Sequence, residues 1–178
     1  MSVDLARHFG EGGTFAQAIE GYRVRPQQLA FAEAVREAVQ SSGVLIAEAG
    51  TGTGKTFAYL VPALIAGGRV IVSTGTKTLQ DQLFHRDIPT VLGALDLPVR
   101  IALLKGRANY VCLHHLEEAL ESGTFGSRDE AKHIHAIRAF SMRTQTGDRA
   151  DCVGVPETSG AWARASSTRE NCLGSTCR

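Results

Sequence analysis

The sequence lacks the hallmarks of several protein classes. No apolar run reaches the roughly 18 residues that a membrane span requires. The first 21 residues contain no basic segment followed by an apolar one, so we expect no secretory signal and a cytoplasmic location. The net charge is only +1 and the calculated pI is about 7.8. A dedicated nucleic-acid-binding module usually has a pI above about 9, so any nucleic-acid contact must come from local features.

Cysteine and aromatic residues are scarce. Four cysteines in a chain without a secretory signal argue against a disulfide scaffold and leave metal ligation or free thiols. Trp162 is the one tryptophan, and we interpret it as a packing anchor because a base-stacking platform needs several aromatic rings. The length of 178 residues favours one domain or slightly more. Its hydrophobic content of 43% is sufficient for a core.

The most informative stretch is rich in glycine. It follows the apolar run 44–46, precedes a helical pattern, and reads Ala49-Gly50-Thr51-Gly52-Thr53-Gly54-Lys55-Thr56. A strand, a glycine-rich turn ending in Lys-Thr, and a helix together give the Walker A context. Only the first consensus glycine is replaced, by Ala49. A purely structural glycine turn is the alternative, and the completeness of the motif disfavours it.

The chemistry of polyphosphate binding explains these residue types. Glycines lack a Cβ, so the backbone can curl tightly and bring its N–H groups close to phosphate oxygens. A helix that begins near Lys55 adds the positive end of its dipole, roughly half a unit charge. Lys55 would reach the β- and γ-phosphates, and the Thr56 hydroxyl would hold Mg²⁺. The stretch therefore predicts a site for ATP with Mg²⁺.

The pattern around this loop predicts an α/β fold. Apolar runs predict strands at 44–47, 69–73 and 99–104. Helical periodicity predicts helices at 25–40, 55–66, 77–85 and 88–95, with Pro62 expected to kink the second or end it early. Alternating strands and helices favour a parallel, doubly wound sheet flanked by helices, with ligands at the carboxyl ends of the strands.

The pattern of alternating strands and helices ends after residue 104. Helices are predicted at 113–121 and 129–143, the second with Ile134, Ile137 and Phe140 on one face. Residues 144–178 show almost no periodicity, so we expect this tail to be mobile or held by its cysteines. Asp129-Glu130 looks like a DEAD/DEAH-type acidic motif, but no strand precedes it. We interpret both residues as the acidic first turn of a helix.

The cysteines leave three interpretations open. All four, Cys112, Cys152, Cys172 and Cys177, could form a thiolate zinc site. Alternatively, Cys112, Cys172 and Cys177 hold zinc or an iron–sulfur cluster with a fourth ligand beyond Arg178, or the thiols are unligated.

Two further groups of polar residues have both a structural and a functional interpretation. The pairs His114-His115 and His133-x-His135 are expected to be solvated or near helix caps, because no carboxylate or cysteine spacing was found to match them. Thr76 is expected to cap a helix. With its neighbours Thr74, Lys77 and Gln82, it could also bind the phosphates of a nucleic-acid backbone.

Four runs carry a resemblance to a known family: EAGTGTGKTFAYLVPAL, VIVSTGTKTLQDQLFHRDIP, ALLKGRANYVC and NCLGSTC. They resemble the DinG/YoaA branch of the XPD-like superfamily 2 DNA helicases, and the likeness extends from Arg25 to Cys177. It implies a bacterial, cytoplasmic enzyme that hydrolyses ATP to move 5′→3′ along single-stranded DNA. Such enzymes unwind duplexes, including forked DNA, in repair and replication. It also implies part of a RecA-like P-loop NTPase domain over residues 1–109 and the start of an iron–sulfur cluster insertion domain over 110–178.

The resemblance also implies roles for individual residues. Arg25 and Gln28 would read the adenine, and the loop from Ala49 to Thr56 would hold ATP. The residues implied to contact single-stranded DNA are Thr74, Thr76, Lys77 and Gln82. Three of the four ligands of a 4Fe–4S cluster would be Cys112, Cys172 and Cys177, with Cys152 outside the site.

The fourth cluster ligand, a DEAH-type Walker B motif and a second RecA-like domain are absent from the sequence. We therefore expect an N-terminal fragment that binds nucleotide weakly and alone neither hydrolyses ATP usefully nor unwinds DNA. Two alternatives stay open, a small P-loop kinase-like protein and a non-enzymatic four-cysteine zinc module. The kinase would need a second acidic strand end and an arginine-rich lid.

Overall fold

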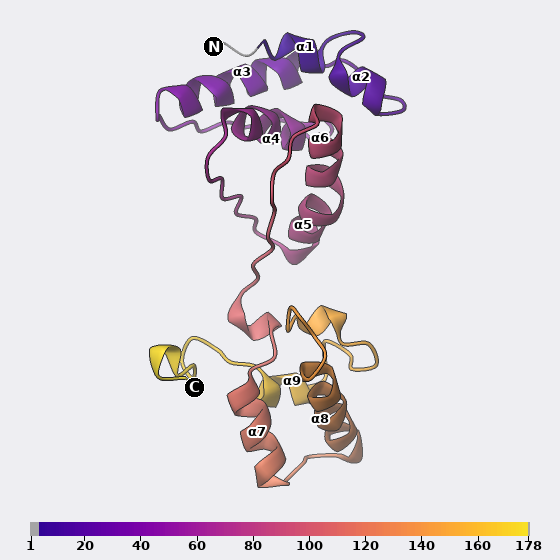
Figure 1. Cartoon of the computed structure of the whole chain (residues 1–178), viewed down its shortest axis with the longest axis vertical. Coiled ribbons are helices and arrows are strands. Elements are labelled where there is room, and N and C mark those ends of the chain that lie inside the picture. Colours follow the sequence, from indigo (N-terminus) through magenta and orange to yellow (C-terminus); the bar gives the residue numbers. More distant parts are fainter. Residues whose placement is uncertain (1–3, 178) are drawn as a thin grey trace. The chain divides into compact units, whose positions relative to one another are not determined.

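A computed structural model of the chain describes residues 4–177 and divides into two compact units (Figure 1). The first unit ends at Leu103 and the second begins at Leu104. The predicted domain boundary lies six residues later, after residue 109, and the identity of the two units with the two predicted domains stays a prediction. Among the described helices, none combines the length and apolarity that a membrane span needs.

The first unit is built from helices joined by extended segments. Its helices are α1 Ala6–Phe9, α2 Thr14–Ala18, α3 Pro26–Gln40, α4 Lys55–Ala66, α5 Lys77–Gln82 and α6 Ile88–Leu95. A π-helical turn, Leu83–Asp87, joins α5 to α6. The helix predictions are confirmed to within a few residues. Pro26 occupies the first turn of α3, where its missing N–H costs nothing. Pro62 lies inside α4, which nevertheless continues to Ala66.

The core of the first unit lies where α3 and α4 pack together and the short amino-terminal helices cover them (Figure 1). Its buried side chains are Leu5, Phe9, Phe15, Ala32, Ala58, Leu60, Val61, Leu83 and Val91. The centroid of the Phe15 ring lies 5.2 Å from that of the Phe9 ring and 5.4 Å from that of the Phe57 ring. This aromatic group packs Phe57, and with it the first turn of α4, against the amino-terminal helices.

The predicted parallel sheet is wrong for this structure. Over residues 4–177 there is no β-strand, and the one bridge is an isolated antiparallel pair, Tyr110 with Asp148. The predicted strands are extended but unpaired, and Val44, Ile46 and Ile71 are 92%, 95% and 94% exposed. The apolar pattern predicts an extended backbone, whereas a sheet also needs hydrogen-bonding neighbours. In doubly wound sheets such neighbours need not be consecutive in sequence, so a local pattern does not determine them.

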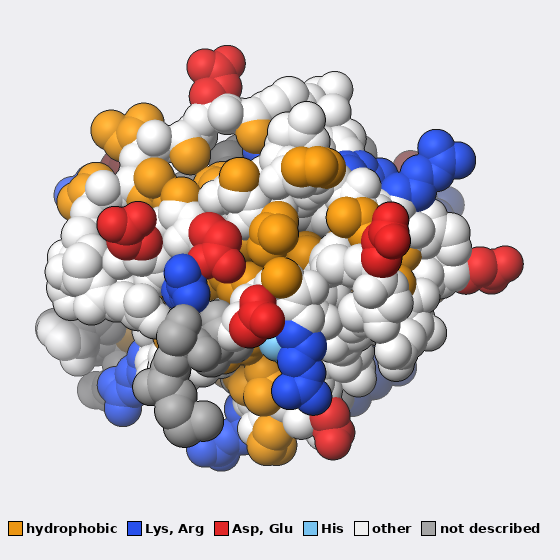
Figure 2. Space-filling model, turned by 90° about the horizontal axis from the view of Figure 1, so that it is seen from above, with side chains coloured by type: hydrophobic (Ala, Val, Ile, Leu, Met, Phe, Trp, Pro, Cys, Tyr) orange, Lys and Arg blue, Asp and Glu red, His pale blue; other side chains and the backbone are white. Residues whose placement is uncertain are grey.

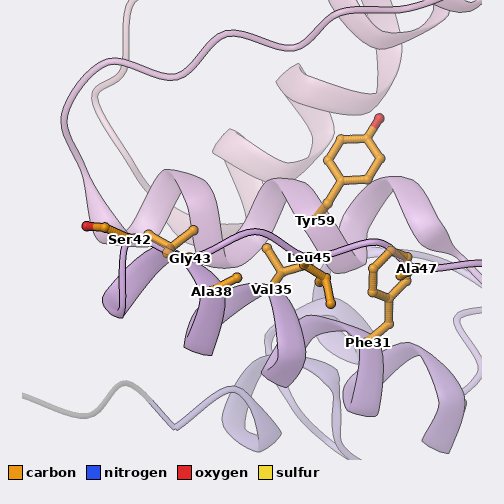
Figure 3. A pocket seen from close by; sticks show the side chains of 9 residues that line it. Phe31, Val35, Ala38, Ser42, Gly43, Leu45, Ala47 and Tyr59 are labelled. Atoms are coloured by element: carbon orange, nitrogen blue, oxygen red, sulfur yellow. The ribbon is translucent and has the colours of Figure 1, made fainter.

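The extended segment after α3 runs back alongside that helix and leaves a pocket of about 520 Å³ (Figure 3). Tyr59 of α4 also lines it. The lining is mostly apolar and comprises Phe31, Val35, Ala38, Val39, Ser42, Gly43, Leu45, Ala47 and Tyr59. None of the residues predicted to bind nucleotide lines this pocket, so it is not the predicted ATP site.

The second unit is a small helical body. Helices α7 Leu113–Ser122, α8 Arg128–Ser141 and α9 Gly160–Ala165 pack on one another, and 3₁₀ turns occupy Arg107–Asn109, Arg149–Asp151 and Gly174–Thr176. Its core contains Leu116, Ala119, Ile134, Ile137, Phe140, Cys152, Val155, Ala161, Trp162 and Ala165. The predicted apolar face of α8 is thus confirmed.

The prediction that residues 144–178 are mobile or held by cysteines is wrong for residues 152–165. Val155, Ala161 and Ala165 are buried beside Trp162, which is 2% exposed and is confirmed as a packing anchor. The sequence pattern does not reveal this helix, because α9 has only six residues, fewer than two full turns.

Candidate functional site

The glycine-rich loop leads directly into α4. Gly52 and Gly54 both have a φ of 78°, in the left-handed region that residues with a Cβ rarely adopt. The Thr53 hydroxyl donates to the Gly50 carbonyl at 2.9 Å, which closes the loop on itself. Gly54 is the N-cap of α4, so the loop ends at the positive end of that helix.

The Lys55 ammonium lies inside this turn. Its Nζ donates to the carbonyl oxygens of Ala49 at 2.6 Å and Gly50 at 2.7 Å. These contacts place a positive charge at the mouth of the loop, next to the helix N-terminus. A lysine that starts the helix and reaches back across the loop has the arrangement required to bind an anionic phosphate group.

Gln28, predicted to read the adenine, contacts the loop directly. Gln28 is 3% exposed, and its Nε2 donates to the Gly54 carbonyl at 3.0 Å. The Tyr22 hydroxyl lies 3.2 Å from Gln28 Oε1. A Cβ on Gly54 would come within 2.1 Å of Gln28 Nε2. Gln28 therefore fixes the position of the loop backbone, while Arg25 directs a guanidinium N–H to the Arg23 carbonyl at 3.3 Å.

Thr56, predicted as the Mg²⁺ ligand, forms a side-chain hydrogen bond with Tyr59 one turn further along α4. Burial raises the pKa of Tyr59, the bond with Thr56 lowers it, and the Asp87 carboxylate raises it. The net shift is upward, so Tyr59 is a neutral phenol at physiological pH.

The residues predicted to contact DNA lie at the start of α5 and at its end. The Thr76 side chain accepts from the Leu79 backbone N–H at 3.3 Å, which confirms its capping role. Thr74 donates to the Thr76 carbonyl at 3.1 Å, and Lys77 is exposed. Gln82 differs, because its Nε2 donates to the buried Asp87 carboxylate at 2.8 Å.

The surface charge gives no single-sign patch on the face that Figure 2 shows, where acidic and basic side chains are interspersed with hydrophobic ones. This agrees with the near-neutral composition. The predicted acidic first turn at Asp129 and Glu130 is confirmed at the start of α8. Ser127 accepts from the Glu130 N–H at 3.1 Å, and Asp129 and Glu130 form an acidic first turn in the second unit.

The three predicted cluster ligands lie at ordered positions of the second unit. Cys112 is the N-cap of α7, and its backbone N–H donates to the Ala165 carbonyl at 2.7 Å. Cys172 and Cys177 flank the 3₁₀ turn 174–176. The backbone N–H of Gly174 lowers the pKa of the Cys172 thiol, and Arg107 and Ser167 lower it further. A lowered pKa increases the fraction of Cys172 present as thiolate, which is the form that binds metals.

Cys152 differs from the other three. It is 5% exposed in the core of the second unit, and burial raises the pKa of its thiol. Four thiolates on one zinc ion would lie roughly 3.8 Å apart, given a Zn–S bond of about 2.3 Å. Within residues 4–177, the cysteines form no group whose donors approach one another this closely. The four-cysteine zinc site thus has no support from the thiol positions of the described residues. A cluster binds each thiolate to a different iron atom, which allows wider spacing.

A further group of metal-binding side chains was missed in the sequence. The donor atoms of His114, His115 and Glu118 all lie within 4.8 Å of one another on α7. The signal was present, because Glu118 follows the two histidines by four and three residues, the spacing that places side chains together on a helix. His133 instead bonds to the Ser159 hydroxyl at 2.8 Å, and His135 packs near Phe125.

Comparison with known proteins gives one family match and several relatives. The model of the DEAD/DEAH box helicase family matches residues 25–118. The chain is similar to "ATP-dependent DNA helicase YoaA" of Haemophilus influenzae, with 46% identity over 97% of this chain and 27% of that protein. It is similar to the protein of the same name from Escherichia coli, with 47% identity over 95% of this chain and 27% of that protein.

A more distant relative is "ATP-dependent helicase DinG" of Mycobacterium tuberculosis, with 37% identity over 88% of this chain and 26% of that protein. The chain thus spans about a quarter of the length of these relatives. The family match covers the glycine-rich loop, Gln28, the α5 segment and Cys112, and it extends over more than half of the chain. The chain therefore belongs to the DEAD/DEAH box helicase family.

Proposed function

We propose that this chain is the nucleotide-binding, amino-terminal portion of a cytoplasmic ATP-dependent DNA helicase. The observation that carries the proposal is the loop from Ala49 to Thr56. Two glycines with left-handed backbone conformation lead this loop into α4, and the Lys55 ammonium donates hydrogen bonds to two of the loop carbonyls. The relatives that match nearly the whole chain are named as ATP-dependent helicases, which supports the same function.

The geometry of the loop supports the roles that we propose for its residues. The loop N–H groups and the α4 dipole bind the phosphates, and Lys55 exchanges its two carbonyl contacts for phosphate oxygens. Thr56 holds Mg²⁺ through its hydroxyl. Arg25 and Gln28, at the start of α3, are the proposed adenine contacts, and the buried Gln28 amide must turn from its bonds to Tyr22 or Gly54 to reach the base. Because Gln28 also donates to Gly54, it links adenine binding to the position of the loop.

Single-stranded DNA is the proposed polymer substrate, with Thr74, Thr76 and Lys77 on its phosphate backbone. The Gln82 amide is oriented by Asp87, so its contact with DNA uses the carbonyl oxygen or the remaining N–H. Cys112, Cys172 and Cys177 are the proposed ligands of a 4Fe–4S cluster, which would supply a rigid metal cross-link between segments far apart in sequence. The helicase would move 5′→3′ and open forked DNA.

Hydrolysis measurements test the proposal. The 178-residue chain should bind nucleotide but show no ATP hydrolysis that single-stranded DNA stimulates, because its relatives are about four times longer. A full-length relative assayed in parallel should hydrolyse ATP only when DNA is added. Robust DNA-stimulated turnover by the 178 residues alone would refute the fragment proposal. Nucleotide binding that Lys55→Ala leaves unchanged would refute the site, and Lys132→Ala is the control.

A further inference from the structure

The first turns of α7 bring two imidazoles and a carboxylate together outside the predicted cysteine site. His114 Nε2 lies 3.4 Å from Glu118 Oε1, and His115 Nδ1 lies 3.0 Å from Glu118 Oε2. The three donor atoms are within 4.8 Å of one another. One carboxylate therefore contacts both rings, each through a different oxygen, and the two rings lie 5.2 Å apart between centroids.

The group of His114, His115 and Glu118 has one buried member and two that solvent can reach. The His115 side chain is 17% exposed, and its Nε2 is buried without a hydrogen-bond partner among residues 4–177. The Glu118 side chain is 58% exposed and that of His114 is 37% exposed. A cation could thus reach the donors from solvent, while burial already restricts the His115 ring.

The donor set has a specific chemistry. Zinc and similar borderline divalent cations are held by imidazole nitrogen and carboxylate oxygen, and sites with three protein ligands leave a fourth position for water. Neighbouring ligands around tetrahedral zinc are roughly 3.3 Å apart, given bonds of about 2.0–2.1 Å. The distances between each histidine and Glu118 already bracket that value. Small rotations of His114 and Glu118 would complete the geometry.

We propose that His114, His115 and Glu118 form a binding site for a divalent cation of the zinc class. The site shares no ligand with the cysteine set, since its donors are nitrogen and oxygen. All three ligands lie within five residues on one helix, so the bound cation would hold the first turns of α7 together. Because the bound cation favours the folded helix, it should raise the thermal stability of the second unit.

Cobalt titration tests the site, because cobalt reports its ligands by absorbance. The untagged chain is titrated with Co²⁺ as wild type and as a variant carrying Cys112→Ser, Cys172→Ser and Cys177→Ser, which removes competing thiolates. Site variants are His114→Ala and Glu118→Gln. Glu117→Gln is the matched control, since Glu117 is an exposed carboxylate on the same helix outside the group. Circular dichroism verifies that each variant is folded.

The expected result is one Co²⁺ per chain with visible d–d bands and no intense thiolate charge-transfer band in the triple-serine variant. His114→Ala and Glu118→Gln should weaken this binding at least about tenfold, because each removes a direct ligand. Glu117→Gln should leave it unchanged. Absence of binding in the triple-serine variant, or binding that both site variants retain, overturns the proposal. Imidazole NMR signals of His114 and His115, but not of His133, should shift with Zn²⁺.

Discussion

Replacing Gly54 by alanine should destabilise the first unit by two separable effects. The φ of 78° places a residue with a Cβ in the left-handed region, which costs roughly 1–2 kcal/mol. The new Cβ would also lie 2.1 Å from Gln28 Nε2, so the buried amide must move away from the Gly54 carbonyl. Losing that hydrogen bond costs about 0.5–1.5 kcal/mol more. We expect a total of about 2–3 kcal/mol.

Gly52→Ala is the matched control for this prediction. Gly52 has the same φ of 78°, but a Cβ added there would meet no atom of residues 4–177 within 4 Å, so only the backbone cost of roughly 1–2 kcal/mol remains. Alanine reduces the entropy of the unfolded chain equally at both positions, so this effect cancels between them. Urea unfolding followed by circular dichroism measures each free energy, and hydrogen exchange in α3 and α4 assigns the change to the first unit.

A double-mutant cycle separates the contact from the strain. In a Gln28→Ala background the clash is absent, so Gly54→Ala should cost about as much as Gly52→Ala, roughly 1–2 kcal/mol. If Gly54→Ala costs the same with and without the Gln28 side chain, the inference that Gln28 fixes the loop is refuted.

Three further predictions concern the second unit. Asp148→Asn should lower the free energy of unfolding, measured in urea, by about 3 kcal/mol, because it removes the carboxylate charge 2.9 Å from Lys105 Nζ and the Lys105 side chain is only 6% exposed. A loss below about 1 kcal/mol, as for a surface ion pair, would contradict this. Trp162→Ala should cost about 3–5 kcal/mol in thermal unfolding, since it empties the centre of that core; an unchanged melting temperature would argue that α9 is not packed there. In the cluster-free chain, iodoacetamide at neutral pH should alkylate Cys172 before Cys152, as read by peptide mass spectrometry, because the pKa of Cys172 is lowered and that of the buried Cys152 is raised; equal rates would contradict both assignments.

Local features were predictable from the sequence because their causes are local. The helix start at Pro26, the Thr76 cap, the acidic first turn at Asp129 and the apolar face of α8 each depend on residues within one or two turns. The glycine-rich loop was predictable for the same reason, since its shape comes from its own glycines.

Long-range features were not predictable in this way. The apolar run Val44-Leu45-Ile46 indicates an extended chain, yet pairing depends on distant neighbours, and these residues form no sheet. The packing of Trp162 against α7 and α8 joins segments that no periodicity connects. Gln28 was predicted to read a base, but its bond to Gly54, 26 residues away, appears only in the structure. The Glu118 group was predictable and was missed because histidine spacing was compared with common metal motifs rather than with the helix repeat.

The central claim is that the loop at the start of α4 binds the phosphates of a nucleotide through Lys55. The most direct measurement is isothermal titration of the chain with Mg–ADP, in wild type and in Lys55→Ala. Saturable binding that Lys55→Ala weakens at least about tenfold, a loss of about 1.4 kcal/mol or more, is the predicted result. Equal affinity of the two proteins, or no binding to either, would contradict the claim.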